Sequence, residues 1–202
     1  MTDTEGRRDG VRILARRTLY EGFSRYCEMD VEERSADGAT HVLSREFQTR
    51  ADVIAVLPYD PHRAIALLAR QLRVPLLARG DHDGYLAEAP AGYIDAGEDA
   101  GTAARREAAE EVGVALAHLE PAGTVFSSPG AMTERISLFL APFSAADRRH
   151  DGGGLAHEGE RIEVLEVPLA DLAAEADAGR LADAKTLILV QALRLRRPGL
   201  FA

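Results

Sequence analysis

The chain has a single cysteine and no long run of apolar residues. Because Cys27 is the only thiol among 202 residues, an intramolecular disulfide and a zinc site built on several thiolates are both excluded. No apolar stretch approaches the roughly 18 residues of a membrane-spanning helix. Residues 1–10 are polar and do not resemble a secretory signal. We therefore expect a cytoplasmic protein with no membrane partner.

Basic residues are also scarce relative to acidic ones. The 24 lysines and arginines are outnumbered by 33 aspartates and glutamates, which gives a formal net charge of −9. This sign argues against a protein that binds nucleic acid through its phosphates, so we expect no nucleic-acid partner. A small polyphosphate can bind such a protein only where local arginines and a metal ion override the repulsive charge. A phosphate-handling function therefore requires identifiable arginines and metal ligands.

Length and composition are those of one ordinary globular core, since 46% of the residues are hydrophobic and 28% are charged. The first part of the chain alternates between apolar and polar residues with a period of two, which predicts β-strands. An Asp-Gly turn signal at 35–38 favours a hairpin. We therefore predict an N-terminal antiparallel β-extension over 1–48, followed by a main domain over 49–202. The strands expected in the extension are 11–14, 20–23, 26–31 and 41–47.

The main domain is predicted to mix strands and helices. A turn signal at 58–61 separates two buried strands, and residues 102–111 are mostly strong helix formers, with Gly113 placed to end the helix. Residues 148–159 are rich in glycine, histidine and acids and are expected to form a mobile loop with a functional role. The expected strands are 53–57, 64–68, 136–141 and 162–167, and the further helices are 169–179 and 183–195.

Three glutamates share one face of the helix predicted at 102–111. Glu107, Glu110 and Glu111 are three and four residues apart, so their side chains emerge together. Like charges at this spacing repel by roughly 0.2–0.5 kcal/mol per pair, a cost that a bound divalent cation would reverse. A metal site and a solvated acidic helix face are both compatible with this spacing alone.

The segment from Gly92 to Val114, called the Nudix box below, resembles the Nudix hydrolase family and matches every fixed position of the pattern that defines it. Ala108 is smaller than the aliphatic residue usual at its position, which affects packing under the helix and no metal ligand. The resemblance implies an α/β/α sandwich with a mixed sheet, and metal-dependent cleavage of a pyrophosphate bond. The matching residues are Gly92, Glu98, Arg106, Glu107, Glu110, Glu111 and Gly113.

The resemblance also implies roles for individual residues. Arg106 is expected to pair with Glu98 and hold a tight loop, formed with the help of Gly92 and Gly97, against the helix. Magnesium, with manganese as a substitute, is the expected metal because it prefers hard oxygen ligands and the chain has no His or Cys cluster. Arg106 and Glu111 count among the expected catalytic residues. The expected metal ligands are the carbonyl of Ala91 and the carboxylates of Glu107, Glu110 and Glu111.

Segments outside the Nudix box resemble the ADP-ribose and GDP-mannose pyrophosphatases of the family. The stretches from Glu88 to Gly92 and from Ser128 to Gly130 are similar to segments that flank the box in that branch. Pro129 lies fifteen residues beyond Val114, a spacing typical of the branch. By the same resemblance, Glu134 stands where the branch has an acid for the terminal ribose or sugar.

Residues 152–166 resemble the GDP-mannose pyrophosphatases in particular. In relatives, an acid of this loop serves as the general base or assists the metal. The resemblance places Glu158 in that role, with Glu160 as the second choice. A solvated loop with no chemical role is the alternative.

Arginines suit a forked contact to a diphosphate, and Arg50 and Arg73 are the candidates. Arg73 belongs to a Gln-Leu-Arg segment that resembles the diphosphate-binding segment of relatives, although either arginine is equally compatible with a surface role. Phe23 and Tyr26 are able to stack on a purine, but we expect a core role for both. The expected substrate-binding residues are Arg50, Arg73, Glu88, Pro129 and Glu134.

Taken together, the residues and the resemblance predict a homodimeric enzyme that hydrolyses a nucleoside diphosphate sugar to a nucleoside monophosphate and a sugar phosphate. GDP-mannose and ADP-ribose are the leading substrates. Two alternatives stay open: a non-catalytic nucleotide-sugar sensor, and a house-cleaning enzyme for nucleoside triphosphates.

Overall fold

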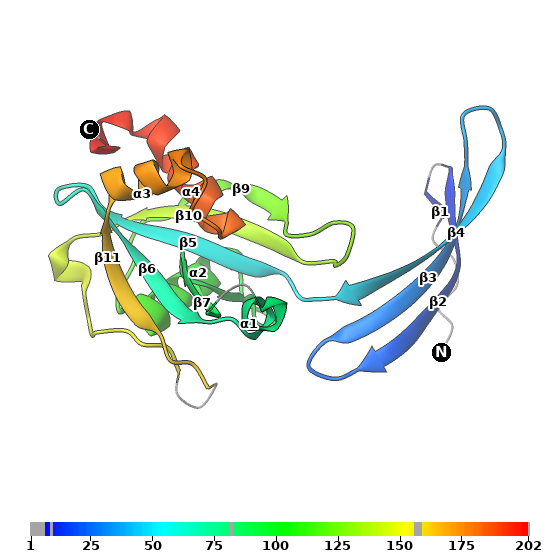
Figure 1. Cartoon of the computed structure of the whole chain (residues 1–202), viewed down its shortest axis with the longest axis horizontal. Helices are drawn as coiled ribbons and strands as arrows, with labels where there is room; N and C mark the ends of the chain where they lie inside the picture. The colour runs from blue at the N-terminus through cyan, green and yellow to red at the C-terminus, as the bar shows by residue number, and fades with distance from the viewer. Residues whose placement is uncertain (1–6, 9, 81–82, 156–158, 202) are drawn as a thin grey trace. The chain divides into compact units, whose positions relative to one another are not determined.

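The computed structural model, drawn in Figure 1, describes residues 7–8, 10–80, 83–155 and 159–201. It divides into two compact units. Unit 1 comprises Met1–Ala51 and Phe126–Glu134, and unit 2 comprises Asp52–Val125 and Arg135–Ala202.

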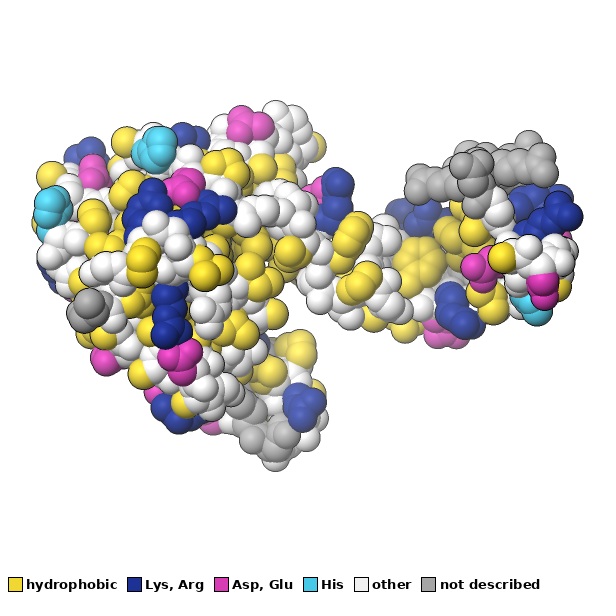
Figure 2. Space-filling model, turned by 90° about the horizontal axis from the view of Figure 1, so that it is seen from above, with side chains coloured by type: hydrophobic (Ala, Val, Ile, Leu, Met, Phe, Trp, Pro, Cys, Tyr) yellow, Lys and Arg dark blue, Asp and Glu magenta, His cyan; other side chains and the backbone are white. Residues whose placement is uncertain are grey.

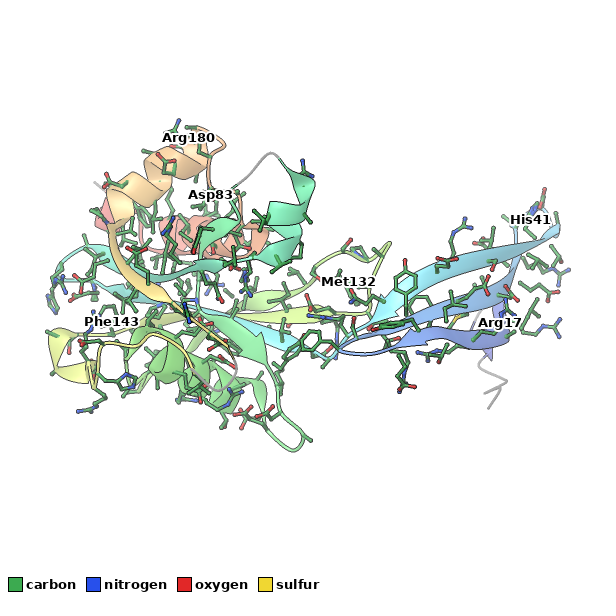
Figure 3. All side chains as sticks on the ribbon, turned by 60° about the horizontal axis from the view of Figure 1, so that its bottom comes forward. Arg17, His41, Asp83, Met132, Phe143 and Arg180 are labelled. Atoms are coloured by element: carbon green, nitrogen blue, oxygen red, sulfur yellow. The ribbon has the colours of Figure 1, made fainter. Side chains whose placement is uncertain are left out.

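The segment 126–134 joins unit 1 through backbone hydrogen bonds to Gln48. The Gln48 N–H donates to the Ala131 carbonyl at 2.8 Å, and the Gln48 carbonyl accepts from the Thr133 N–H at 3.1 Å. Met132, labelled in Figure 3, forms a parallel β-bridge with Gln48. The division of the chain therefore does not follow the expected boundary after residue 48, because a distant segment completes the end of the N-terminal unit.

Unit 1 is built on a four-stranded antiparallel sheet in the order β1-β2-β3-β4. This confirms the N-terminal antiparallel β-extension. Its strands are β1 (Arg7–Arg8), β2 (Val11–Glu21), β3 (Arg25–Arg34) and β4 (Thr40–Thr49). The expected strand at 20–23 is wrong in its second half, because β2 ends at Glu21 and the chain turns at 22–24. A Cβ on Gly22 would lie 2.3 Å from the Tyr20 hydroxyl oxygen, so glycine makes room for the Tyr20 ring in this turn.

Unit 2 contains a seven-stranded mixed sheet in the order β11-β6-β5-β10-β9, with β7 paired to β6 and β8 paired to β5. Strands β5 and β10 are parallel, whereas β6 is antiparallel to β5, β7 and β11. The mixed sheet is therefore confirmed. Its strands are β5 (Val53–Asp60), β6 (Ile65–Leu72), β7 (Tyr85–Glu88), β8 (Ala91–Tyr93), β9 (Glu120–Phe126), β10 (Arg135–Pro142) and β11 (Glu163–Pro168).

The turn between β5 and β6 lies later than expected. Strand β5 continues through Pro58 to Asp60, and the turn occupies 61–64. Two backbone N–H groups, those of His62 and Arg63, donate to Asp60 Oδ1 at 2.9 and 3.1 Å, which starts the turn at Asp60. Pro58 pairs in register with Ala141 of β10, a tertiary contact that local sequence does not encode.

Four α-helices and two short 3-10 helices complete the described chain. The helices predicted at 102–111, 169–179 and 183–195 are present, whereas the first helix was not predicted. None of the described helices is long and apolar enough to cross a membrane. The α-helices are α1 (Val74–Arg79), α2 (Ala100–Val112), α3 (Leu169–Asp177) and α4 (Ala184–Arg196), and the 3-10 helices are η1 (Ala145–Asp147) and η3 (Pro198–Phe201).

The sheet of unit 2 lies between two helical layers, with α2 on one face and α3 and α4 on the other (Figure 1). Alternate residues of β5 serve the two layers: Leu57 packs in the cluster that contains Leu189 of α4, and Val56 packs in the cluster that contains Ala108 of α2. Ala108 is fully buried. The α/β/α sandwich is therefore confirmed. Helix α2 packs against the sheet through its apolar side.

Candidate active site

Helix α2 holds the three box glutamates in a well-defined frame. It begins after Asp99, whose Oδ1 accepts from the N–H groups of Gly101 and Thr102 at 2.8 and 3.0 Å. It ends at Gly113, which adopts the left-handed conformation with φ 73°. Both ends are therefore fixed by caps, and the buried alanines on its apolar side, packed against the sheet, set the direction of its glutamates.

Two of the three glutamates are buried. Glu107 is 8% exposed and Glu111 is 1% exposed, while Glu110 is half-buried. A solvated acidic face does not fit Glu107 and Glu111, because a carboxylate loses its hydration when it is buried. The side chains of Glu107 and Glu111 therefore point into the protein interior, where their carboxylates need hydrogen-bond donors or a cation.

Burial changes the acidity of these two carboxyl groups. It raises the pKa of Glu111 to about 8, and the charges of Glu107 and Glu160 add to the effect. Burial also raises the pKa of Glu107 to about 6, although the hydrogen bond from Arg106 opposes it. Both carboxylates are thus held in surroundings that disfavour their charge, which is typical of sites that bind a cation or perform proton transfer.

Arg106 connects α2 to the loop that precedes it. Its guanidinium donates from Nε and Nη2 to the two Glu98 carboxylate oxygens at 3.2 and 3.0 Å, and from Nη2 to the Tyr93 carbonyl at 2.9 Å. Its Nη1 donates to Glu107 at 2.7 Å and to Glu110 at 3.2 Å. The expected pairing of Arg106 with Glu98 is therefore present, and the same side chain also orients two box glutamates.

The two glycines of this loop have different roles. Gly97 adopts a left-handed conformation with φ 87°, as expected for a tight turn. Gly92 instead lies in β8, in register with Ile54 of β5, and the carboxylate of Glu107 fills the space where its side chain would begin. The expected turn role of Gly92 is therefore corrected: the residue provides room for Glu107.

Ala91 faces Glu111 across the junction of β8 and α2. The Ala91 N–H donates to Glu111 Oε2 at 3.2 Å. This contact brings the backbone of the expected carbonyl ligand next to the most buried glutamate. The role of the Ala91 carbonyl as a metal ligand stays a prediction.

The donors around Glu111 suit a hard divalent cation. Carboxylates and a backbone carbonyl are the ligand types that magnesium and manganese prefer. Among the residues that the structure describes, no three acidic, histidine or cysteine side chains are grouped closely enough to hold a metal. Glu107 and Glu110 accept hydrogen bonds from Arg106, whereas Glu111 accepts one from the Ala91 N–H. The three carboxylates therefore have different partners in this structure. The donor chemistry fits a cation, and the ligand set stays a prediction.

Glu88 is buried between two cations. It is 4% exposed, accepts from Arg73 Nε at 2.5 Å and forms an ion pair with Lys185. Lys185 also contacts Asp183 at 2.9 Å. The Arg73 side chain is 40% exposed, and the charge of Glu111 is among the interactions that raise the pKa of its guanidinium. The structure therefore brings Arg73 and Glu88 together beside the box, and their contacts to substrate stay predictions.

The two candidate loop acids differ in what the structure describes. Glu158 lies outside the described residues. Glu160 is half-buried, its Oε2 accepts from the Leu155 N–H at 2.9 Å, and its charge acts on both Glu107 and Glu111. The loop therefore carries an acid close enough to influence the box, and the assignment of the general base stays a prediction.

The remaining expected contacts belong to unit 1. Arg50 Nε lies 3.6 Å from Glu134 Oε2, and its guanidinium lies 5.5 Å from the centre of the Phe23 ring. Pro129 is exposed. The expected core role of Phe23 and Tyr26 is wrong, because their exposed fractions are 90% and 42%. Phe23 lies in the turn between β2 and β3, and Tyr26 lies near the start of β3.

Comparison with known proteins identifies the family. The NUDIX domain model matches residues 49–188. The chain belongs to the NUDIX domain family. This confirms the resemblance carried by the Nudix box and matches the α/β/α architecture of unit 2.

The relatives of this Nudix chain include two curated enzymes of similar length. It is 36% identical over 186 residues to the GDP-mannose pyrophosphatase of Cronobacter sakazakii, covering 92% of this chain and 96% of that protein. It is 34% identical over 184 residues to the GDP-mannose pyrophosphatase of Klebsiella pneumoniae subsp. pneumoniae, covering 91% of each. A crystal structure of an ADP compounds hydrolase has the same fold, with a TM-score of 0.72, 20% identity, and coverage of 94% and 95%.

Sequence reasoning missed three residues that support this Nudix site. Asp183, Lys185 and Thr186 belong to the start of α4, which was predicted as a helix with no role at the site. Lys185 pairs with Glu88, and Thr186 Oγ1 accepts from the Ala89 N–H at 2.7 Å. The only signal in the sequence was a lysine next to a helix cap, which is common on protein surfaces.

Proposed function

We propose that the chain is a divalent-metal-dependent hydrolase that cleaves the pyrophosphate bond of a nucleoside diphosphate sugar. The products are a nucleoside monophosphate and a sugar phosphate. The observation that carries the proposal is the pair of buried carboxylates, Glu107 and Glu111, on a capped helix. Two buried acids of like charge are costly without a cation, and a cation beside an arginine suits a diphosphate.

The relatives favour GDP-mannose as the substrate. Two proteins named GDP-mannose pyrophosphatase match more than nine tenths of this chain, including the β-extension of unit 1. Identities of 36% and 34% over such lengths support a shared reaction class more strongly than a shared sugar. ADP-ribose is therefore the second substrate to test.

Four groups around helix α2 are the expected ligands of the metal. Glu107, Glu110, Glu111 and the Ala91 carbonyl would hold magnesium or manganese. When bound, such a cation neutralises the diphosphate and lowers the pKa of the attacking water. Arg106 keeps Glu107 and Glu110 directed toward the loop side of α2 through hydrogen bonds of 2.7 and 3.2 Å.

The other residues bind the substrate and move a proton. Arg73 donates from its guanidinium to the diphosphate, while Glu88 accepts from its Nε. A water oxygen forms a bond to one phosphorus as the bridging P–O bond breaks, and the bridging oxygen leaves with the other phosphate. Glu160 or Glu158 takes the proton of that water and acts as the general base.

The proposal includes a homodimer formed through unit 1. Large hydrophobic side chains of its sheet are exposed, among them Leu19 at 49%, Tyr20 at 65% and Val42 at 64%. Figure 2 shows hydrophobic side chains at the surface of this unit. Exposed apolar groups on one sheet are typical of an interface. Removal of residues 1–45 should give a monomer with weaker nucleotide binding in size-exclusion and titration experiments, and a stable, active dimer would contradict this part.

A substrate panel with magnesium tests the reaction. We expect turnover of GDP-mannose or ADP-ribose, with other nucleotide sugars, dinucleotides and nucleoside triphosphates cleaved more slowly. Glu111→Gln should lose most of the magnesium-dependent turnover while remaining folded. Glu163→Gln is the matched control, because Glu163 is an exposed acid that pairs with Arg70 outside the site. Binding without cleavage of any compound would favour the sensor, and preferential cleavage of triphosphates would favour the house-cleaning enzyme.

A further inference from the structure

The first turn of α4 carries a buried hydroxyl group that is bonded on both sides. Thr186 is fully buried. Its Oγ1 donates to Asp183 Oδ2 at 2.5 Å and accepts from the Ala89 N–H at 2.7 Å. Asp183 Oδ2 also accepts from the Thr186 N–H at 3.0 Å and caps the helix. The hydroxyl therefore connects the cap of α4 to the chain between β7 and β8.

The bonding leaves this hydroxyl a single orientation. A hydroxyl has one proton to donate, and the ionised Asp183 is able only to accept it. The lone pairs of Thr186 Oγ1 are then available to the Ala89 N–H, which has no acceptor of its own in a ladder between strands. Asp183 thus fixes the direction in which Thr186 holds the backbone of Ala89.

The backbone held in this way is the corner at 88–91. One residue before Ala89, Glu88 binds the side chains of Arg73 and Lys185. Two residues after it, Ala91 donates to Glu111 at 3.2 Å. A shift of the corner would therefore move a diphosphate-binding arginine and the partner of the most buried glutamate together.

We propose that Thr186, oriented by Asp183, is a positioning residue of the active site. Its hydroxyl fixes the 88–91 corner so that Ala91 and Arg73 stay aligned with Glu111. The activity part of this inference rests on the proposed hydrolase function. A residue that holds metal ligands in place by hydrogen bonds touches neither metal nor substrate. Its substitution nevertheless typically lowers the affinity for the metal or the rate of the reaction.

A purely structural hydroxyl would behave differently. A valine has the shape of threonine, so Thr186→Val would then cost stability without changing the chemistry of the folded molecule. The sequence supplies a matched control in α2, where Thr102 Oγ1 donates to the helix cap Asp99 at 2.7 Å. Thr102 is exposed, and among the described residues its hydroxyl accepts no hydrogen bond from the 88–91 corner. Thr102→Val therefore removes the same cap contact alone.

Three measurements on the purified full chain test the proposal: amide hydrogen exchange at Ala89, the Kd for Mn²⁺, and kcat and KM for the best substrate of the panel. In Thr186→Val, we expect faster exchange at Ala89 and an increase of about tenfold or more in the Kd for Mn²⁺. The value of kcat should fall by about tenfold or more, with KM changed by less than about threefold. Thr186→Ser, which keeps the hydroxyl, should restore all three, and Thr102→Val should match the wild type.

The outcomes separate this proposal from the proposed function. If Thr186→Val exchanges faster at Ala89 but keeps the wild-type kcat and Kd for Mn²⁺, the hydroxyl is only structural and the proposal is overturned. If the wild type cleaves no nucleotide sugar, the proposed function fails, while Ala89 exchange and Mn²⁺ binding still decide the role of Thr186. If Thr186→Val does not fold, Thr186→Ala replaces it, since alanine also removes the hydroxyl that accepts from Ala89 and is a stronger helix former than valine.

Discussion

The carboxylate of Glu107 occupies the space where a side chain on Gly92 would begin. A Cβ on Gly92 would lie 1.9 Å from Glu107 Oε1 and 2.1 Å from its Cδ, far below van der Waals contact. Strand β8 and helix α2 therefore approach so closely that the acid lies directly against the strand backbone. Glycine at this position of the Nudix box is required by the placement of a neighbouring acid, which buries Glu107 beside Ala91 and Glu111.

Substitution of Gly92 by alanine tests this relationship. The new methyl group meets only the far end of a flexible side chain, so Glu107 is able to swing away at a cost of about 1 kcal/mol in the free energy of unfolding. We expect Gly92→Ala to stay folded and to lose most metal-dependent turnover. Thermal unfolding and kcat measured on the same preparation check this.

Gly97→Ala provides the control for Gly92→Ala. Gly97 has a φ of 87°, and a Cβ built on it would have open space around it, so an alanine there is strained but displaces no side chain. We expect Gly97→Ala to lower the free energy of unfolding by about 1 kcal/mol and to keep its turnover when folded. Retained activity in Gly92→Ala, or a larger loss of activity in Gly97→Ala, would contradict the role given to Gly92.

The stability of the metal-free protein should decrease as pH rises from about 5 to 8. The pKa of Glu111 is raised in the folded state from its ordinary value of 4.5 to about 8. Between these values the folded protein binds more protons than the unfolded chain, so deprotonation destabilises it. Magnesium needs the ionised carboxylate, and its stabilising effect should therefore grow over the same range. Thermal unfolding at pH 5.5 and pH 8, with EDTA or with magnesium, measures both effects.

Glu111→Gln should remove most of this pH dependence. The amide is neutral at both pH values, so the metal-free variant should be more stable than the wild type at pH 8 and no more stable at pH 5.5. Magnesium should raise the Tm of the variant much less than that of the wild type. A variant that keeps the pH dependence would show that Glu107, whose pKa is raised to about 6, or another group is responsible.

Part of this site was predictable because its signals are local. The helix-forming residues between Asp99 and Gly113 predict helix α2, and both of these residues cap it in the structure. Glu107, Glu110 and Glu111 follow from helical spacing alone. The pairing of Arg106 with Glu98 needed the family resemblance, since no general rule connects residues eight apart across a loop.

The rest depended on contacts between residues distant in the chain. Lys185 and Glu88 are 97 residues apart, and only the packing of α4 against the sheet brings them together. Pro58 was predicted to form a turn because the sequence does not show that β10 pairs beside it. The burial of Glu107 was hidden for the same reason, because a charged residue on an alanine-rich helix is normally solvated.

Arg106→Lys should loosen the loop before α2. A lysine retains the charge but loses the forked contact to Glu98 and the bond to the Tyr93 carbonyl. We expect a loss of about 2 kcal/mol in the free energy of unfolding and a lower kcat. Arg105→Lys is the control, because among the described residues the neighbouring Arg105 donates to two backbone carbonyls and to no carboxylate. Its cost should be about 1 kcal/mol or less, and equal effects of the two variants in urea unfolding would contradict the role of Arg106.

The loop that carries Glu160 is attached to the end of α2 through its glycines. The N–H groups of Gly153 and Gly154 donate to the carbonyls of Glu111 and Glu110, both at 3.0 Å. A Cβ on Gly152, whose φ is 76°, would lie 2.4 Å from the Glu111 carbonyl oxygen. This atom belongs to the backbone, so no side chain is able to move aside as Glu107 does for Gly92.

Gly152→Ala should therefore separate the loop from the helix, and Gly159→Ala should not. Gly159 has a similar φ of 78° but open space around it, so both alanines carry the same left-handed strain and only one meets a backbone oxygen. We expect a loss of about 1 kcal/mol for Gly159→Ala and more than about 2 kcal/mol for Gly152→Ala in urea unfolding. Because Gly152→Ala also moves Glu160 relative to Glu111, its kcat should fall while that of Gly159→Ala is kept. Equal losses in the two variants would mean that the conformation of the loop, and not its attachment to α2, determines the cost.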